Sequence, residues 1–416
     1  MVKFSHKNKL VSFGITAMAL GCAVWVGFRP EFSALLLASI VAVLALSILF
    51  CKKYNHAGLV VNRMLVGALF IFSSFTKGVD PLGTKYKILD YLSAYGMQWL
   101  NDAALVLAVT LILAEFIVGI CLFLNMLPRL ATLGATLLML FFTITTYFDA
   151  MYDLVPDCGC FGTAIKMSNW QTFFKNIIID SVLIPLIFNN KSLVNGRVTK
   201  LGQWLFAVIF AAGFIGFEIY NIRHLPVVDF MDWKVGKDMT PKDYDAGKIF
   251  VTYQNKETAE TQEFESPDYP WNDSVWMSQW EFVSQRTEGG SHTLGFAMLD
   301  ADGEDFTHIL FETENLYVFV APYIDEFTDE DFRLCGKMIE TIENEGANYI
   351  WLTAVLPENV RKFHEKYQMF YDVYFGDELE LKTMVRSNPG LMLIDNGLIV
   401  NKWSKIDFPI NTTPNP

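Results

Sequence analysis

The chain has 416 residues, a mean hydropathy of +0.29 and only 19% charged residues, a composition too apolar for a soluble protein. Its formal charge of −13, with no basic patch to offset it, argues against nucleic-acid binding. The apolar residues are concentrated before about residue 222, in runs near the ~20 residues that cross a bilayer. The composition therefore predicts a membrane protein with an acidic, soluble C-terminal half.

The N-terminal half contains seven apolar segments that we expect to be transmembrane helices. The first begins after a basic cluster, and its apolar run continues through Cys22, which favours an uncleaved anchor over a signal peptide. The segments span residues 10–28, 31–51, 58–77, 103–124, 128–150, 172–189 and 202–220.

The positions of lysine and arginine predict the orientation of these segments. Lys52 and Lys53 follow the second segment, Arg129 follows the fourth, and Lys191 and Lys200 follow the sixth, so these ends are expected in the cytoplasm. An odd number of spans then places the C-terminal half, and the loop after the fifth segment, on the opposite face. For a bacterial inner-membrane protein that face is the periplasm.

Two thiols one residue apart lie in that loop, in the run Asp157-Cys158-Gly159-Cys160-Phe161-Gly162. A Cys-x-Cys disulfide closes a small, strained ring, and strain makes such a bond labile and suited to exchange. We therefore expect Cys158 and Cys160 to be the catalytic pair of a redox site. The alternative is a tight loop whose cysteines only pack or bind a metal. Asp149 and Asp153 precede the thiols and either raise their pKa or solvate a helix end.

Two carboxylates, Glu115 and Asp180, lie deep in apolar segments, where ionisable residues are costly and usually face a polar interior. One interpretation is a proton path or a contact to a quinone headgroup, linked to the thiol chemistry. The other is a structural clasp between helices, with Arg63 or Lys175 as the partner. Both stay open at this point.

Several of these stretches resemble the DoxX/MauE group of bacterial four-helix membrane proteins, in the branch that carries a fused extracytoplasmic domain. The resemblance covers residues 58–190, and the Cys-Gly-Cys-Phe-Gly element is its most specific part. It implies that Cys158 and Cys160 exchange disulfides, with quinone as the linked cofactor and an envelope protein as client. Residues 1–57 and 191–222 are additions to the four-helix unit. The stretches are 63–77, 80–83, 115–116, 157–162 and 169–173.

Residues 223–416 change to short strands and amphipathic helices, which predicts a separate α/β domain with a β-rich N-terminal extension. After a strand at 248–253, the extension reaches about residue 291, and a hairpin-like lead-in covers 293–310. We expect later strands at 316–321, 349–354, 369–373, 390–394 and 398–403, and helices at 328–345, 357–367 and 377–386.

This order is similar to a membrane-tethered thioredoxin-like domain, in which Pro389 occupies the position of a cis-proline. The domain departs from that pattern where a Cys-x-x-Cys motif is expected, because the chain reads Pro322-Tyr323-Ile324-Asp325-Glu326 there. Cys335 lies within the predicted helix and is expected to be a buried hydrophobe. The domain alone therefore lacks the dithiol that exchange requires.

The sequence favours a membrane thiol–disulfide redox protein whose soluble domain recruits a client. The alternative is a non-enzymatic scaffold or assembly factor of the envelope, with structural cysteines. A transporter is a weaker third reading, since no internal repeat is evident. No zinc motif or nucleotide-binding glycine loop stands out.

Overall fold

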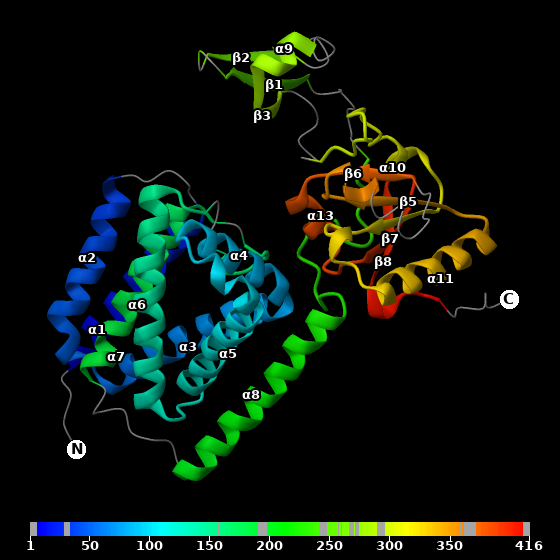
Figure 1. Ribbon diagram of the computed structural model, residues 1–416. Coiled ribbons are helices and arrows are strands. Elements are labelled where there is room, and N and C mark those ends of the chain that lie inside the picture. Colours follow the sequence, from blue (N-terminus) through cyan, green and yellow to red (C-terminus); the bar gives the residue numbers. More distant parts are fainter. Residues whose placement is uncertain are drawn as a thin grey trace. The chain divides into compact units, whose positions relative to one another are not determined.

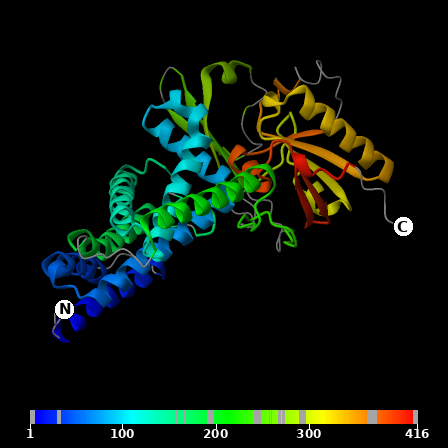
Figure 2. The same ribbon diagram turned by 90° about the horizontal axis from the view of Figure 1, so that it is seen from below.

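The computed structural model describes residues 6–28, 34–155, 159–165, 167–189, 198–240, 248–256, 258, 260–265, 270, 274–288, 296–357, 359–361 and 372–410. The chain forms two compact units, residues 1–231 and 232–416 (Figures 1 and 2).

The first unit is helical. Five of its helical stretches are long and apolar enough to cross a membrane: 56–79, 98–123, 128–152, 169–188 and 200–223. These match five of the seven expected segments, whereas membrane crossing by the first two helices stays a prediction. The helices are α1 (His6–Phe28), α2 (Ala34–Phe50), α3 (His56–Val79), α4 (Pro81–Ala94), α5 (Ala104–Phe123), α6 (Pro128–Tyr152), α7 (Asn169–Phe188) and α8 (Lys200–Arg223).

Helix α4 begins directly after α3, within the stretch 80–83. The Asp80 carboxylate caps it by accepting a hydrogen bond from the Gly83 backbone N–H at 2.9 Å. Pro81 occupies the first helical position, where its missing N–H costs nothing. Aspartate and proline are therefore helix-start signals here.

Helices α3 and α5 lie side by side and approach most closely at two glycines (Figure 1). A Cβ added at Gly67 would lie 2.9 Å from the Gly119 carbonyl oxygen, and one added at Gly119 would lie 2.9 Å from the Ile71 nitrogen. Small residues of this kind let membrane helices pack backbone against backbone. The contact fixes how the polar ends of the two helices face each other.

The first helix and the last helix join this pair through specific contacts, whereas α2 packs on α1 and α7. The Thr16 hydroxyl of α1 donates to the Asn62 side chain of α3 at 2.7 Å. The Phe214 ring of α8 stacks on Phe116 of α5, with centroids 3.9 Å apart. The first unit is therefore larger than a four-helix bundle.

The second unit contains a three-stranded antiparallel sheet in the order β2-β1-β3, within the range expected for the β-rich extension. Trp276, in the short helix that directly precedes β3, contacts the rings of Tyr253, Phe264 and Trp280. These rings form the aromatic core of the three-stranded sheet. The elements are β1 (Lys248–Asn255), β2 (Thr261–Glu265), α9 (Ser274–Gln279) and β3 (Trp280–Glu288).

A five-stranded sheet follows, in the order β6-β5-β4-β7-β8. The pairs β4–β5 and β5–β6 are parallel, and β4–β7 and β7–β8 are antiparallel. Helix α11 connects β4 to β5 and buries Cys335 and Met338 against Phe319 and Trp351 of the sheet. The elements are α10 (Ile309–Glu312), β4 (Leu316–Val320), α11 (Asp329–Glu345), β5 (Asn348–Thr353), β6 (Val373–Phe375), α13 (Glu378–Met384), β7 (Gly390–Asp395) and β8 (Leu398–Ser404).

Most elements expected in this half are present, with one correction. The strand expected within 306–310 is wrong, because α10 begins there and Leu299 makes only isolated bridges, to Asp305 and Phe375. The expected helix at 357–367 and the strand at 369–373 fall largely on 362–371, outside the described residues.

The predicted cis-proline is confirmed, since the Asn388–Pro389 peptide bond is cis and directly precedes β7. The Asn388 amide accepts from the Tyr323 N–H at 3.4 Å and donates to the Tyr323 carbonyl at 3.0 Å. The segment after β4 is thus tied to the cis-proline turn by a side chain. Whether this unit is thioredoxin-like stays a prediction.

The glycine contact between α3 and α5 leads to a first prediction. We expect Gly119→Ala to destabilise the membrane unit by about 1–3 kcal/mol, the usual cost of overpacking a close contact. Gly213→Ala in α8 is the matched control, because a Cβ there meets nothing within 4 Å. Thermal unfolding in detergent measures both, and equal midpoints for the two variants would contradict the prediction.

The N-terminus of α11 leads to a second prediction. Burial raises the pKa of Asp331, but hydrogen bonds from Lys405 and Thr328 outweigh it and hold that pKa below its usual range. A lowered folded-state pKa means that the stabilisation is complete above the unfolded pKa and is lost as pH falls through the folded value. Lys405 Nζ lies 2.8 Å from the carboxylate.

We therefore expect Asp331→Asn to cost about 1 kcal/mol of local stability at neutral pH, a value that allows for the exposed lysine. The cost should shrink as pH falls below about 4, where carboxylates take up protons. Deuterium uptake in peptides covering α11, compared with wild type at each pH, measures it. Glu340→Gln, an exposed site on the same helix, is the control. A cost that does not change with pH would rule out the ion pair as its source.

Candidate functional site

The described part of the thiol loop is anchored on α3 and α5. The Ser73 hydroxyl lies 2.9 Å from the Cys160 carbonyl oxygen and 3.0 Å from Glu115 Oε2, so its single proton serves one of them at a time. The other carboxylate oxygen, Oε1, forms an ion pair with Lys77. Cys160 is half-buried at this junction, whereas Cys158 lies outside the described residues.

Two glycines allow the loop to approach these helices. Gly162 has a φ of +56°, and an added Cβ would lie 3.3 Å from the Thr76 carbonyl oxygen at the end of α3. Gly159 has a φ of +60°, and an added Cβ would lie 3.1 Å from Cγ of Lys87 in α4. Both conformations favour glycine, so the spacing of glycines around the thiols reflects backbone geometry.

Lysines from three helices lie around this loop. Lys87 of α4 covers Gly159, and Lys175 of α7 lies over the Phe161 ring, 4.6 Å from its centroid. Lys77 of α3 is 4% exposed and is charge-balanced by Glu115, which is 1% exposed. Lys87 Nζ lies 3.9 Å from the Asp90 carboxylate, so two of these three lysines face a carboxylate. A nearby cation favours the thiolate, the form of cysteine that exchanges, and here Lys175 brings that charge to the loop.

The structure identifies the partner of Glu115 and corrects the expected clasp. Arg63 instead donates to the carbonyls of Leu122 and Phe123, and Lys175 lies at the loop. In the sequence, Lys77 lies at the end of its apolar segment, a position typical of a lysine that anchors a helix at the membrane interface. The crossing of α3 and α5 brings it onto the buried carboxylate.

Asp180 belongs to a different polar cluster. Its Oδ2 accepts from the Thr143 hydroxyl of α6 at 2.8 Å. Towards the thiol loop, the same α6–α7 contact holds Asp153, which accepts from the Asn169 amide at 2.9 Å. Asp149 is fully buried and accepts from the Tyr91 hydroxyl at 2.5 Å. Whether Asp149 and Asp153 affect the thiol pKa stays a prediction.

A third buried carboxylate was missed from the sequence. Glu218 of α8 is 0% exposed, and neither of its oxygens has a hydrogen-bond partner among the described residues. In the sequence, Glu218 lies near the end of the last apolar segment, where a carboxylate is expected to reach the membrane interface. The apolar residues on both sides of Glu218 were the sequence signal that could have indicated its burial.

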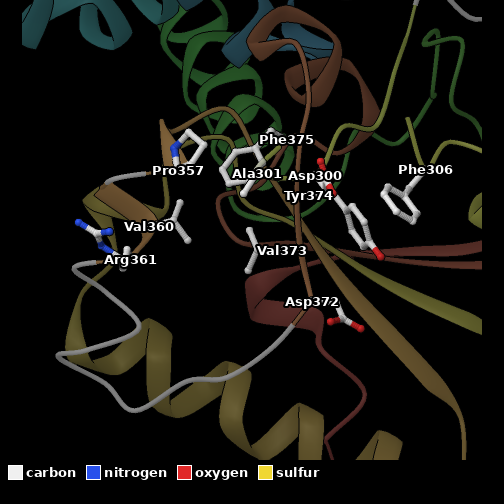
Figure 3. A pocket seen from close by; sticks show the side chains of 10 residues that line it. All are labelled: Asp300, Ala301, Phe306, Pro357, Val360, Arg361, Asp372, Val373, Tyr374 and Phe375. Atoms are coloured by element: carbon white, nitrogen blue, oxygen red, sulfur yellow. The ribbon is translucent and has the colours of Figure 1, made fainter. Parts of the chain in front are cut away.

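The second unit contains a cavity of about 610 Å³ beside β6 (Figure 3). Aromatic rings of Phe306 and Tyr374 line it together with the charged side chains of Asp300, Arg361 and Asp372. We assign no ligand to it. Across the described ranges, no three potential metal ligands cluster.

Comparison with known families identifies the membrane unit. Residues 55–188 match the family described as methylamine utilisation protein MauE, so the chain contains a MauE family domain. This range covers α3 to α7 and includes the Lys77–Glu115 pair and the thiol loop. No curated protein and no solved structure matched the chain. With five apolar helices of spanning length, the chain is a multi-pass membrane protein that contacts the lipid bilayer.

The buried ion pair leads to a third prediction. Glu115→Leu leaves the Lys77 ammonium buried without its counter-ion, which we expect to cost about 3–5 kcal/mol. Replacing both partners, as Lys77→Met with Glu115→Leu, should recover most of that stability, because apolar pairs of similar volume substitute well for buried ion pairs. Thermal unfolding of the two single variants and the double variant in detergent gives the coupling energy. Additive effects would show that the pair is not energetically coupled.

Proposed function

Because residues 55–188 form a MauE family domain, we propose that this chain is a membrane thiol–disulfide redox protein that exchanges electrons through Cys158 and Cys160. One observation carries the proposal: the backbone of Cys160 is held by Ser73 beside a buried ion pair, on a loop ringed by lysines. A nearby lysine and partial exposure are typical of reactive cysteines and not of cysteines that only pack.

In the exchange step, a client thiolate attacks the Cys158–Cys160 disulfide. One sulfur–sulfur bond breaks and another forms, which gives a mixed disulfide and a loop thiolate. A second client thiolate then displaces the loop, so the client leaves oxidised and the loop is left as a dithiol. Lys175, whose ammonium lies over the ring of the adjacent Phe161, stabilises the departing loop thiolate before it takes up a proton.

The family association implies quinone as the acceptor that reoxidises the loop. A bound quinone supplies a two-electron, two-proton acceptor. Ser73 and Lys77 would supply an O–H and an N–H donor beside the loop for the carbonyl oxygens of such a group, with Glu115 as the partner of both. Asp180 was expected to share this role, but its hydrogen bond is to α6. We propose that the contact involves Glu115 and not Asp180.

We propose further that the C-terminal unit is a thioredoxin-like domain on the periplasmic face that recruits the client. The order of its five-stranded sheet and the cis Asn388–Pro389 bond support this assignment. The unit lacks Cys-x-x-Cys after β4, and Cys335 is fully buried. Burial, and then the charge of Asp331, raise the pKa of Cys335, which makes it a poor nucleophile. Exchange is therefore assigned to the loop.

The second candidate is an envelope scaffold whose cysteines are structural. The same loss of Cys-x-x-Cys favours it, because the soluble domain then has only a docking role. The two candidates differ in whether Cys158 and Cys160 change redox state during the life of the protein.

The fourth prediction separates these candidates. We expect thiol trapping with a mass-shifting alkylator in membranes to show Cys158 and Cys160 in mixed redox states that become more reduced when quinone is depleted. Cys160→Ala should capture a disulfide-linked client on Cys158, whereas Cys335→Ser should leave the pattern unchanged. A pair that stays in one state under every condition would leave only the scaffold.

A further inference from the structure

The carboxyl edge of the five-stranded sheet gathers three neighbouring segments. Strands β4, β5 and β6 are parallel, so the segments that follow them all leave the sheet at the same edge. Two hydrogen bonds join these segments: the Ala354 N–H donates to the Pro322 carbonyl at 3.3 Å, and the Gly376 N–H donates to the Thr353 carbonyl at 3.0 Å. The turn before β7 lies at this edge too, because β7 is antiparallel to β4. In open α/β sheets this edge is where ligands bind.

Two leucines of these segments are exposed, although their side chains are large and apolar. Leu356 follows β5 and is 61% exposed, and Leu379 lies in the first turn of α13, after β6, and is 63% exposed. A single exposed leucine is ordinary on a protein surface. Two leucines in adjacent segments of one edge, together with the half-buried ring of Tyr323, offer apolar contact area to a partner.

The same segments carry an excess of carboxylates. Asp325 and Glu326 follow Tyr323 closely, are exposed and form no ion pair among the described residues. Glu378 begins α13 and accepts from the Tyr323 hydroxyl at 2.5 Å. The cation of this helix is already engaged, since Lys382 pairs with Glu378 and its ammonium lies 5.1 Å from the centroid of the Tyr323 ring. The edge therefore presents net negative charge.

The charge and the position of this edge are fixed within the unit. Burial raises the pKa of Glu378, but hydrogen bonds from Lys382 and Tyr323 outweigh it and hold that pKa below its usual range, so Glu378 stays ionised at neutral pH. Asn388 holds the Tyr323 backbone at both its N–H and its carbonyl. A surface fixed in this way binds a partner at a smaller cost in conformational entropy. We call it the carboxyl-edge surface, and its members are Tyr323, Asp325, Glu326, Leu356, Glu378 and Leu379.

We propose that the carboxyl-edge surface binds a segment of the client protein in which basic residues alternate with apolar ones. This partner class rests on the proposed function, in which the C-terminal unit recruits the client. Lysine or arginine side chains of the segment pair with Asp325 and Glu326, and its apolar side chains cover Leu356 and Leu379. The net negative charge disfavours nucleic acids and anionic lipid surfaces as partners, because both are polyanionic.

An ordinary solvated edge would carry some of the same carboxylates, because helix starts favour acidic residues. Its attraction for cations would depend on the charge of the whole unit. Removing two carboxylates elsewhere on the unit would then have the same effect as removing Asp325 and Glu326, and the two exposed leucines would make no difference.

The fifth prediction uses the full-length protein in nanodiscs of phosphatidylcholine, a lipid without net charge, and a fluorescent decapeptide of serine, lysine and leucine. We expect this lysine peptide to bind, whereas a matched peptide with glutamate in place of lysine should not. Asp325→Asn with Glu326→Gln should weaken binding about threefold to tenfold, the effect of losing two exposed charge pairs. This difference should shrink at high salt, which screens exposed charges. Fluorescence anisotropy measures each affinity.

Glu314→Gln with Glu340→Gln is the matched control, because it removes the same charge from two exposed sites towards the amino edge of the sheet. It should leave the affinity unchanged. Leu356→Ser with Leu379→Ser should weaken binding at both low and high salt, since salt does not screen apolar contacts. Equal affinity for the two peptides, or equal weakening in the control, would overturn the proposal. Self-association of the chain that the leucine variant abolishes would assign the surface to a second copy and overturn it as well.

Peptide binding needs no thiol chemistry, so it is separate from the redox step of the proposed function. Cys158→Ala with Cys160→Ala should bind the lysine peptide as the wild type does. A chain that captures a client on Cys158 but binds neither peptide would refute only the carboxyl-edge surface. A chain that binds the lysine peptide while its cysteines never change redox state would refute only the redox function.

Discussion

The membrane unit depends on the close contact of α3 and α5 at Gly67 and Gly119. Inside a bilayer, helix association relies on packing and on satisfied polar groups, because the lipid offers no hydrophobic driving force between helices. The glycine contact brings the backbones together, and the facing ends of the two helices then place Lys77 against Glu115. Each charge offsets the cost of burying the other. The Ser73 hydroxyl lies between Glu115 and the Cys160 carbonyl oxygen and so connects the ion pair to the thiol loop. The loop is therefore positioned by the same contact that holds the two helices together.

The soluble unit shows the opposite arrangement, a well-formed α/β core without exchange chemistry. The cis-proline turn is present, but the segment after β4 carries Tyr323 where a dithiol would be needed, and Asn388 ties its backbone in place. A further contact holds the same segment, since the Tyr323 hydroxyl donates to Glu378 at 2.5 Å. Hydrogen bonds of this kind fix a surface instead of leaving a reactive group on it. The division favours reaction chemistry in one unit and recognition in the other.

The sequence predicted the helices and most strands because hydrophobic periodicity and length determine them locally. The likeness of the C-terminal half to a thioredoxin-like domain also led to the cis bond at Pro389, which the structure contains. The sequence did not predict which cation meets Glu115, because that depends on how two helices cross, and a lysine at a helix end is locally an anchor. It separated Asp180 from Thr143, Thr146 and Asn176 for the same reason: residues that meet across α6 and α7 are tens of positions apart. Of the thiol pair, only Cys160 is placed by the described structure.

The two polar clusters of the membrane unit differ in charge balance. At the loop, a lysine meets a carboxylate, so the pair can remain ionised while buried. On α6 and α7, the three carboxylates Asp149, Asp153 and Asp180 face tyrosine, asparagine and threonine, and none has a cationic partner within the described ranges. Isolated charges at that depth are costly, so polar groups there have to be satisfied by hydrogen bonds between helices. The first cluster therefore keeps its two charges beside the thiol loop, whereas the second joins the helices through hydrogen bonds alone, and only the first contacts the backbone of Cys160.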